Sequence, residues 1–447
     1  MSWLAGALEE TAQYSSRESL STFERSIESQ WIDEALCATG TASIRRRRLP
    51  AEQVVWIVLG MALTRDRPIK EVVSKLDLAL PGPREEVASS SVSQARGRLG
   101  PAPLRWLFDR CSSRWALQSA MRYKWQGLGV FALDGTTLRV ADSDANRAHF
   151  GLASGGDRAA SGYPMLRLVT LAAARSHLIY SASFGPYKDG EHTYAQPLLE
   201  KIPPNSVLLV DRGFFAAKIF VGIERAGENR HWLIRSKVHT KWRILKRLGR
   251  DDLMVELDVS PSAKLADPSL PRTFTARAIG YTSPRAKRAW LLTSLSNATL
   301  YPAKEVIALY RERWELELAY DELKTHLLDR RETIRSRSVA GVEQELWGIL
   351  LTYNLVRLEM DRIAHEANLA PSRISFLSAT RLIRDEWSWC AVAQPGTIPQ
   401  KLRRLREDLL RFVLPARRSK RIYPRAVKIK MSHYEKKRPD AARGAPK

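Results

Sequence analysis

The hydrophobic positions of the chain follow two different spacings, and the change from one to the other falls near Gly127. Between residues 20 and 120 the apolar residues recur at the spacing of helices. The run Val54–Leu63, preceded by Pro50 near a first helical turn, predicts a buried helix, and Ile69–Leu78 predicts a short amphipathic one. The first 120 residues are therefore predicted to be helical.

Beyond Gly127, short apolar runs predict the strands of a sheet. The runs are Val130–Leu133, Leu166–Ala174, Leu178–Phe184, Val207–Val210 and Trp232–Arg235. Helical segments are predicted between them, at Tyr194–Glu200 and Ala216–Ala226. Strands mixed with helices are typical of an α/β core with a mixed sheet.

Residues 238–288 interrupt this pattern with several prolines and with the alternating stretches Leu253–Val259 and Phe274–Ile279, which predict a small β-rich insertion. The α/β pattern resumes at Trp290. From Ala303 to about Leu328 the spacing is that of one helix, and Val342–Ala364 predicts a second, long apolar helix. The last third of the chain is predicted to be helical and increasingly basic.

The charge balance indicates which kind of partner the protein binds. The 447 residues include 72 Lys and Arg but only 48 Asp and Glu, a formal net charge of +24. Such an excess indicates a polyanion, most often nucleic acid, although a generic basic protein or an RNA binder would show it too. Two basic clusters stand out, the tail beyond Arg417 and four adjacent arginines: Arg45, Arg46, Arg47 and Arg48. Each cluster is either a solvated charge run or a contact to phosphates.

The cysteines and the lengths of the apolar segments indicate the cellular compartment of the protein. Cys37, Cys111 and Cys390 are sparse and lack the spacing of zinc ligands, which favours a reducing cytosol. Residues 1–20 contain no signal-peptide core, and the ten residues Val54–Leu63 are too few to cross a bilayer. We therefore expect a cytoplasmic, nucleoid-associated protein with no membrane partner.

Three carboxylates are candidates for chemistry. Asp134 and Asp211 each directly follow an apolar strand, where a carboxylate is costly to desolvate without a partner. An ordinary aspartate at a strand-to-turn junction is the alternative for either one alone. As a pair they indicate a hard cation such as Mg²⁺, which prefers carboxylate oxygens.

The third carboxylate, Glu317, lies on the helix predicted from Ala303. Four polar residues share an arc of about 60° on one face of that helix: Tyr310, Arg313, Glu317 and Lys324. Beside the arc runs an apolar stripe: Leu309, Leu316 and Leu323. If the stripe docks on the sheet, Glu317 meets the two aspartates, and Arg313 and Lys324 can hold phosphates. A salt-bridged surface helix would show the same spacing.

In this order the motifs resemble the DDE transposases of bacterial insertion sequences, in the group often called the IS-four family. The helix carries Tyr-x-x-Arg-x-x-x-Glu-x-x-x-x-x-x-Lys in full, the signature of that group. Leu133–Thr136 and Asp211–Phe214 resemble its two aspartate motifs, Arg47–Glu52 resembles its N-terminal domain, and Gln344–Trp347 resembles the region beyond the glutamate. The resemblance covers most of residues 25–360.

The resemblance implies a ribonuclease-H-like core with a β-rich insertion, in which Asp134, Asp211 and Glu317 are catalytic and hold two Mg²⁺ or Mn²⁺ ions. It also implies double-stranded DNA as the substrate, both element ends and target, bound by a homodimer in a synaptic complex. The residues expected to touch DNA are Tyr310, Arg313, Lys324, Arg212, Trp290 and the four arginines at 45–48. Trp290, in the context Trp-Leu-Leu-Thr-Ser, would receive a flipped base if the ends close as hairpins, or else is a core tryptophan.

Five parts follow from these patterns. A helical N-terminal DNA-binding domain is expected at 1–120, and the two parts of the ribonuclease-H-like core at 121–237 and 290–365. The insertion falls at 238–289 between them, and a helical C-terminal region with its basic tail at 366–447. Alternatives are a stand-alone nuclease or resolvase with the same carboxylates, a DNA-binding protein without activity, and a carboxylate-pair glycosidase, which leaves the basic charge unexplained.

Overall fold

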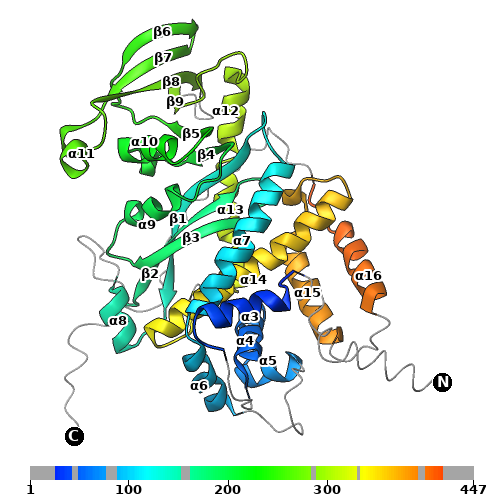
Figure 1. The fold of residues 1–447 in the computed structure, drawn as a ribbon. Coiled ribbons are helices and arrows are strands. Elements are labelled where there is room, and N and C mark those ends of the chain that lie inside the picture. Colours follow the sequence, from blue (N-terminus) through cyan, green and yellow to red (C-terminus); the bar gives the residue numbers. More distant parts are fainter. Residues whose placement is uncertain are drawn as a thin grey trace, which may run out of the picture. The chain divides into compact units, whose positions relative to one another are not determined.

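A mixed sheet organises the described part of the chain (Figure 1). In the computed structural model the described residues are 26–42, 49–76, 88–152, 162–282, 288–329, 333–390 and 398–415. Residues 1–413 cluster into one compact unit, to which the following description applies. The four arginines at 45–48 and the basic tail beyond residue 417 lie outside the described residues.

The sheet has ten strands among the described residues, in the order β3-β2-β1-β4-β5-β9-β8-β7-β6, with β10 paired to β1. The core strands are β1 (Gly129–Val140), β2 (Met165–Ala173), β3 (Ile179–Pro186), β4 (Ser206–Val210) and β5 (Arg230–Arg235). β1, β4 and β5 are parallel, whereas β2 and β3 are antiparallel to their neighbours. The predicted α/β class with a mixed sheet is confirmed.

Strand β1 is longer than its apolar run predicts. We expected the strand to end at Leu133 and a turn to begin at Asp134, but β1 continues to Val140. The continuation is stabilised by its neighbours, because β2 pairs with β1 as far as Arg139 and β10 (Thr333–Ile334) pairs with its last two residues. Asp134 therefore lies within a strand, and the expected turn after it is wrong.

The segment with alternating hydrophobicity extends the same sheet. It contains β6 (Arg243–Gly249), β7 (Asp252–Asp258), a short helix α11 (Pro261–Ala266) and β8 (Thr273–Thr282). Strand β9 (Arg288–Thr293) joins β8 to β5 in antiparallel pairing. The boundary expected between residues 289 and 290 falls inside β9, and the five-part division of the chain stays a prediction.

Long apolar helices cover the core strands. The helix α14 (Val339–Glu366) packs against α7 (Ala102–Arg122) and α4 (Ala51–Leu63), and α7 packs against β3. Both α4 and α14 are buried along most of their lengths, as expected of helices that are apolar on more than one face. The other N-terminal helices are α3 (Ser29–Ala38), α5 (Ile69–Leu76) and α6 (Ser89–Leu99). Shorter helices α8 (Asp144–Phe150), α9 (Glu191–Leu199) and α10 (Ala217–Arg225) follow core strands, and α15 (Phe376–Cys390) and α16 (Ile398–Arg411) end the described part.

The helix expected as one element from Ala303 to about Leu328 has three parts. The helix α12 (Ala303–Arg311) ends before Glu312, α13 (Trp314–Asp321) follows, and Glu322–Leu327 continue as a π-helix. Hydrogen bonds three residues apart tighten the junction, such as Arg313 N–H to the carbonyl of Tyr310 at 3.2 Å. The expectation of one uninterrupted helix is therefore wrong, but its apolar stripe is buried as predicted.

Candidate active site

The register of two parallel strands sets Asp134 beside Asp211. Leu133 of β1 and Val210 of β4 are paired neighbours, so the residues that follow them leave at the same level of the sheet. Residues at one level of neighbouring strands point to the same face. The register therefore brings Asp134, within β1, close to Asp211, the first residue after β4.

Two buried or half-buried tyrosines dock the helices onto these strand ends. The hydroxyl of Tyr310 in α12 donates to the carbonyl of Val210 at 3.5 Å, and that of Tyr320 in α13 donates to the carbonyl of Asp134 at 2.6 Å. Tyr320 also shares a 2.8 Å hydrogen bond with the Thr170 hydroxyl, opposite Asp134 on β2. Each tyrosine thus contacts the backbone next to one of the aspartates.

Arg313 lies between the other two carboxylates. Its Nη1 is 3.5 Å from Oδ1 of Asp211 and its Nη2 is 3.3 Å from Oε1 of Glu317. The Arg313 side chain is only 8% exposed, whereas Asp211 is 43% exposed and Glu317 36%. One nearly buried guanidinium therefore balances two carboxylates that remain accessible to solvent.

The electrostatics of Asp134 link it to the same group. Burial raises the pKa of the Asp134 carboxyl to about 6, against the opposing effect of the Gly135 N–H, which donates to Oδ1 at 2.8 Å. Arg313 also lowers this pKa, whereas the negative charges of Asp211 and Glu317 raise it. Asp134 is thus within electrostatic reach of the other two carboxylates and of Arg313.

Carboxylate oxygens are the donors that Mg²⁺ and Mn²⁺ prefer, so the chemistry of this donor set fits such an ion. Within the described ranges, however, no three His, Cys, Asp or Glu residues are arranged to hold a metal ion together. The Arg313 guanidinium lies between Asp211 and Glu317, in contact with both.

The remaining candidate residues lie on three different elements. Arg212 directly follows Asp211 in a short 3₁₀ turn and is exposed. Lys324 lies in the π-helix seven residues beyond Glu317. Trp290 lies on β9, half-buried, with its ring 5.7 Å from that of Trp242 and 5.3 Å from the Arg288 guanidinium. The structure thus brings together Asp134, Asp211, Glu317, Arg313 and Tyr310, whereas the ring of Trp290 contacts Trp242 and Arg288.

Two further residues lie near the carboxylates: Tyr320, which was not predicted from the sequence, and Glu191, for which the sequence left open a fourth acidic neighbour or, more often, a structural residue. Tyr320 follows Glu317 by three residues, which places both on the same face of the helix. This spacing could have indicated that Tyr320 lies near the carboxylates. Glu191, expected to be structural, receives a 2.9 Å hydrogen bond from Arg167 and lies against Gly135. A side chain at Gly135 would come within 2.8 Å of the Glu191 side chain, so the glycine leaves room for the Glu191 carboxylate beside β1.

A buried ionic cluster fixes the start of the π-helix and also escaped the sequence analysis. Glu322 accepts hydrogen bonds from Arg357 Nε and from the Tyr353 hydroxyl, both at 2.9 Å, and lies 3.3 Å from Nδ1 of His177. Nε2 of His177 lies 3.0 Å from Glu315, on α13. Burial alone would raise the pKa of Glu322, but Arg357 and His177 lower it to about 2. These partners come from distant parts of the chain, so no local pattern indicates them.

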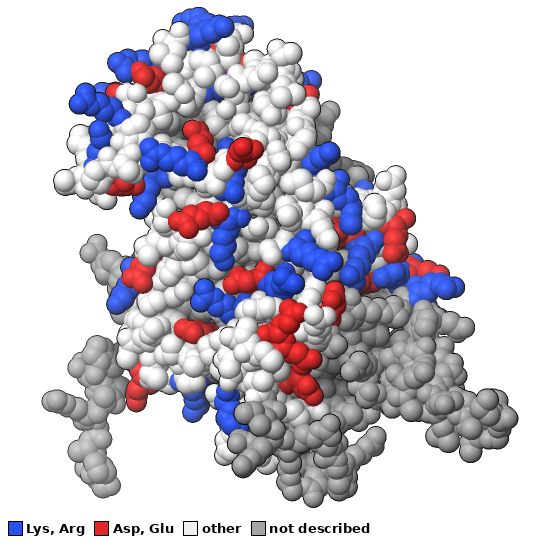
Figure 2. Space-filling model, in the orientation of Figure 1, with Lys and Arg blue, Asp and Glu red and all other residues white. Residues whose placement is uncertain are grey.

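The surface agrees with an anionic substrate. Figure 2 shows Lys and Arg side chains spread over much of the face turned to the viewer, with Asp and Glu between them. None of the described helices is long and apolar enough to cross a membrane.

Comparison with known families shows the class of the protein: an enzyme with a ribonuclease-H-like core that cleaves DNA and transfers its strands, a DDE transposase. A family profile described as "Transposase DDE domain" matches residues 125–355, and one described as "Insertion element 4 transposase N-terminal" matches residues 17–109. The chain belongs to the DDE transposases of the IS4 family. Membership of this family implies a DNA substrate and dependence on a divalent metal ion.

Two relatives from Escherichia coli (strain K12) are similar to the chain. Transposase InsG for insertion sequence element IS4 is 36% identical over 424 residues, which cover 94% of this chain and 95% of that protein. Putative transposase InsZ is 34% identical over 214 residues, 47% of this chain and 70% of that protein. Among solved structures, a piggyBac transposase synaptic complex with hairpin DNA matches at a TM-score of 0.41 with 10% identity, covering 90% of this chain and 86% of that one. That likeness is too slight to support an argument.

Proposed function

We propose that the chain binds the terminal inverted repeats of its insertion sequence, cleaves the element ends by metal-dependent hydrolysis and joins them to target DNA by strand transfer. The observation that carries the proposal is the meeting of Asp211 and Glu317 on Arg313, within electrostatic reach of Asp134. The donor set, its partial exposure and the basic charge of the chain all suit phosphodiester chemistry.

In this proposal Asp134, Asp211 and Glu317 hold two Mg²⁺ or Mn²⁺ ions. Such ions, when bound, make a water molecule or a DNA 3′-hydroxyl nucleophilic and stabilise the leaving oxygen. The guanidinium of Arg313 can exchange a carboxylate for a phosphate oxygen, because its planar donors fit both. Tyr310, Lys324 and Arg212 would hold the DNA end near the scissile phosphate, and Trp290 would stack on a flipped base.

A homodimer is part of the proposal, because two element ends have to be paired before transfer. The reaction would take place on DNA in the bacterial cytoplasm, at the nucleoid.

A cleavage assay tests the proposal. The purified full-length protein is incubated with a plasmid that carries its coding region and flanking DNA, in Mg²⁺, in Mn²⁺ or in EDTA. Metal-dependent breaks at the two borders are expected, followed by joining to a second plasmid. Breaks scattered over the plasmid would indicate a plain nuclease instead, and tight binding without breaks in either metal would contradict the catalytic proposal.

A further inference from the structure

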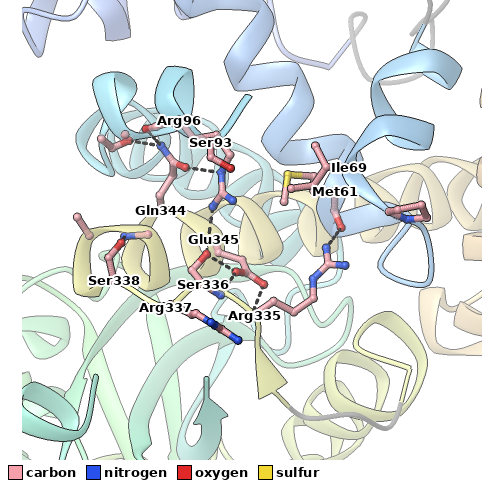
Figure 3. A pocket seen from close by; sticks show the side chains of 15 residues that line it. Met61, Ile69, Ser93, Arg96, Arg335, Ser336, Arg337, Ser338, Gln344 and Glu345 are labelled. Atoms are coloured by element: carbon pink, nitrogen blue, oxygen red, sulfur yellow. Dashed lines mark hydrogen bonds between the residues drawn. The ribbon is translucent and has the colours of Figure 1, made fainter. Parts of the chain in front are cut away.

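A cavity of about 610 Å³ lies where α4, α5 and α6 meet residues 335–345 (Figure 3). The two segments matched by the family profiles each contribute a wall, α6 from the first and the start of α14 from the second. One side of the cavity is apolar, with Met61 and Ile69. The other is polar and carries Arg96 and Arg337, whereas the guanidinium of a third lining arginine, Arg335, reaches the Met61 side and donates to the carbonyls of Arg65 at 3.0 Å and Met61 at 3.5 Å.

The described lining contains one carboxylate, that of Glu345. The hydrogen bonds that Glu345 accepts come from groups other than the guanidinium groups of Arg96 and Arg337. Arg65 lies 2.7 Å from its Oε1, and the Ser336 hydroxyl donates to Oε2 at 2.6 Å. The backbone N–H groups of Arg335 and Ser336 each donate to it at 3.0 Å. Glu345 is thus committed to Arg65 and to this loop, so the cavity keeps a positive charge.

Arg96 and Arg337 differ in how far they are buried and in their hydrogen-bond partners. Arg96 is half-buried, and its hydrogen bonds are to the neutral side chains of Gln344 at 2.9 Å and Ser336 at 3.2 Å. Arg337 is exposed at the cavity wall (Figure 3), while its carbonyl accepts a 2.7 Å hydrogen bond from the Ser143 hydroxyl. The Arg337 backbone is therefore anchored beside the cavity, and its side chain is exposed.

Gln344 fixes the shape of the cavity before any ligand arrives. Its amide nitrogen donates to the carbonyls of Arg96 at 2.9 Å and Gly100 at 2.7 Å, which locks the end of α6 to α14. The N-terminus of α14, capped by Ser338, also lies at the cavity. The positive end of this 28-residue helix adds to the attraction of an anion held by the arginines.

We propose that this cavity binds a backbone phosphate of the element's DNA, through Arg96 and Arg337, as a second contact apart from the carboxylates. The inference rests on the proposed function and specifies where the DNA end runs. Strand β1 connects the two places, because Arg139 pairs with Thr333, two residues before Arg335, and lies five residues beyond Asp134. At 3.3 Å per residue the separation along β1 is about 17 Å. Arg337 lies four residues beyond Thr333, so the contact is expected several base pairs from the scissile phosphate, on a duplex that rises about 3.4 Å per base pair.

The test measures binding of the full-length protein to a labelled duplex carrying one element border, over a series of NaCl concentrations. Arg337→Ala is expected to weaken binding several-fold and to flatten the slope of log K against log salt by about 0.9, the loss of one phosphate contact. Arg337→Lys, which keeps the charge, should restore most of the slope. The control is Arg272→Ala, at an exposed arginine before β8 that is not in the cavity wall, and it should change neither quantity.

Ethylation interference on the same duplex locates the contact. A phosphate several base pairs from the border should block binding of the wild type when ethylated and should lose that effect with Arg337→Ala. If the wild type cleaves the borders but Arg337→Ala keeps its affinity, salt slope and ethylation pattern, this inference is wrong and the transposase function stands. An equal loss with Arg272→Ala would also overturn it, as an effect of general surface charge. Failure of the wild type itself to recognise or cleave the border would count against the proposed function.

Discussion

The guanidinium of Arg313 lies 3.3 Å from the carboxylate of Glu317, across the junction where α12 gives way to α13. Because the same guanidinium also lies 3.5 Å from Asp211, it holds the helix carboxylate against the strand carboxylate. We predict that Arg313 and a divalent ion compete for these two carboxylates, and measurable consequences follow from this prediction and from the surrounding contacts.

Replacing Glu317 by glutamine should separate chemistry from binding. Glu317→Gln keeps the shape of the side chain but removes a negative ligand, so border cleavage should fall by more than about 1,000-fold while affinity for border DNA changes little. Cleavage and binding are measured on the same duplex. The matched control is Glu305→Gln on α12, an exposed carboxylate that bonds to Gln126 at 2.8 Å. A loss of binding together with cleavage would mean that Glu317 is structural.

Removing the guanidinium should make the protein more responsive to divalent ions. With Arg313→Met the repulsion between Asp211 and Glu317 is no longer balanced, so the unfolding midpoint in EDTA should fall. Added Mg²⁺ or Mn²⁺ should then raise the midpoint by more than it does for the wild type, because an ion that binds the folded state stabilises it. Arg311→Met, at an exposed position of α12, is the control. Equal metal-induced shifts in all three proteins would refute the competition.

Much of the core could be predicted from local pattern, because buried strands are continuous apolar runs. The runs of β2 to β5 lie within a residue or two of the observed strands. The end of β1 could not be predicted in this way, since Gly135-Thr136-Thr137 has the composition of a turn. Pairing with β2 on one side and β10 on the other keeps these residues in the strand. Local propensity was overruled by contacts with residues distant in sequence.

The site shows the same limit. Asp134, Asp211 and Glu317 could be singled out because two of them follow apolar runs and the third belongs to a spaced signature; their catalytic role stays a prediction. The break at Glu312 and Arg313 and the π-helix after Asp321 have no counterpart in the spacing. The π-helix begins at Glu322, whose partners His177 and Arg357 are distant in sequence. These contacts form only in the folded chain, so the local sequence pattern does not indicate the π-helix.

The cluster around Glu322 should make stability depend on acid pH. Its pKa of about 2 in the folded protein lies below its ordinary value of 4.5. The ionised carboxylate therefore stabilises the fold fully above pH 4.5, and this contribution is lost as the pH falls toward 2. Glu322→Gln should destabilise by about 3–5 kcal/mol near neutral pH, because Arg357 stays buried without its partner. Urea unfolding at several pH values should show the difference from the wild type shrinking below pH 4.5.

A control separates this charge effect from loss of one hydrogen bond. Tyr353→Phe removes the hydroxyl that donates to Glu322 at 2.9 Å and should cost about 1 kcal/mol. The loss in free energy of unfolding caused by Tyr353→Phe should vary much less with pH than the loss caused by Glu322→Gln. If both differences follow the same pH profile, Glu322 is not the titrating group responsible.

Trp290 offers a test of how the element ends are opened. Its ring is half-buried, held by Trp242 in an edge-to-face contact and by the cation of Arg288, which leaves an indole fixed in orientation. A fixed, partly exposed indole is a suitable platform for a splayed base, with a stacking contribution of about 1–3 kcal/mol. Trp290→Ala should therefore let first-strand nicking at the border proceed while hairpin ends decline about tenfold or more, as resolved on denaturing gels. Trp290→Phe, which keeps an aromatic face, should retain part of the hairpin yield. Complete cleavage by the wild type with no hairpin trapped at any time would remove this role from Trp290 and leave it as a packing residue of β9.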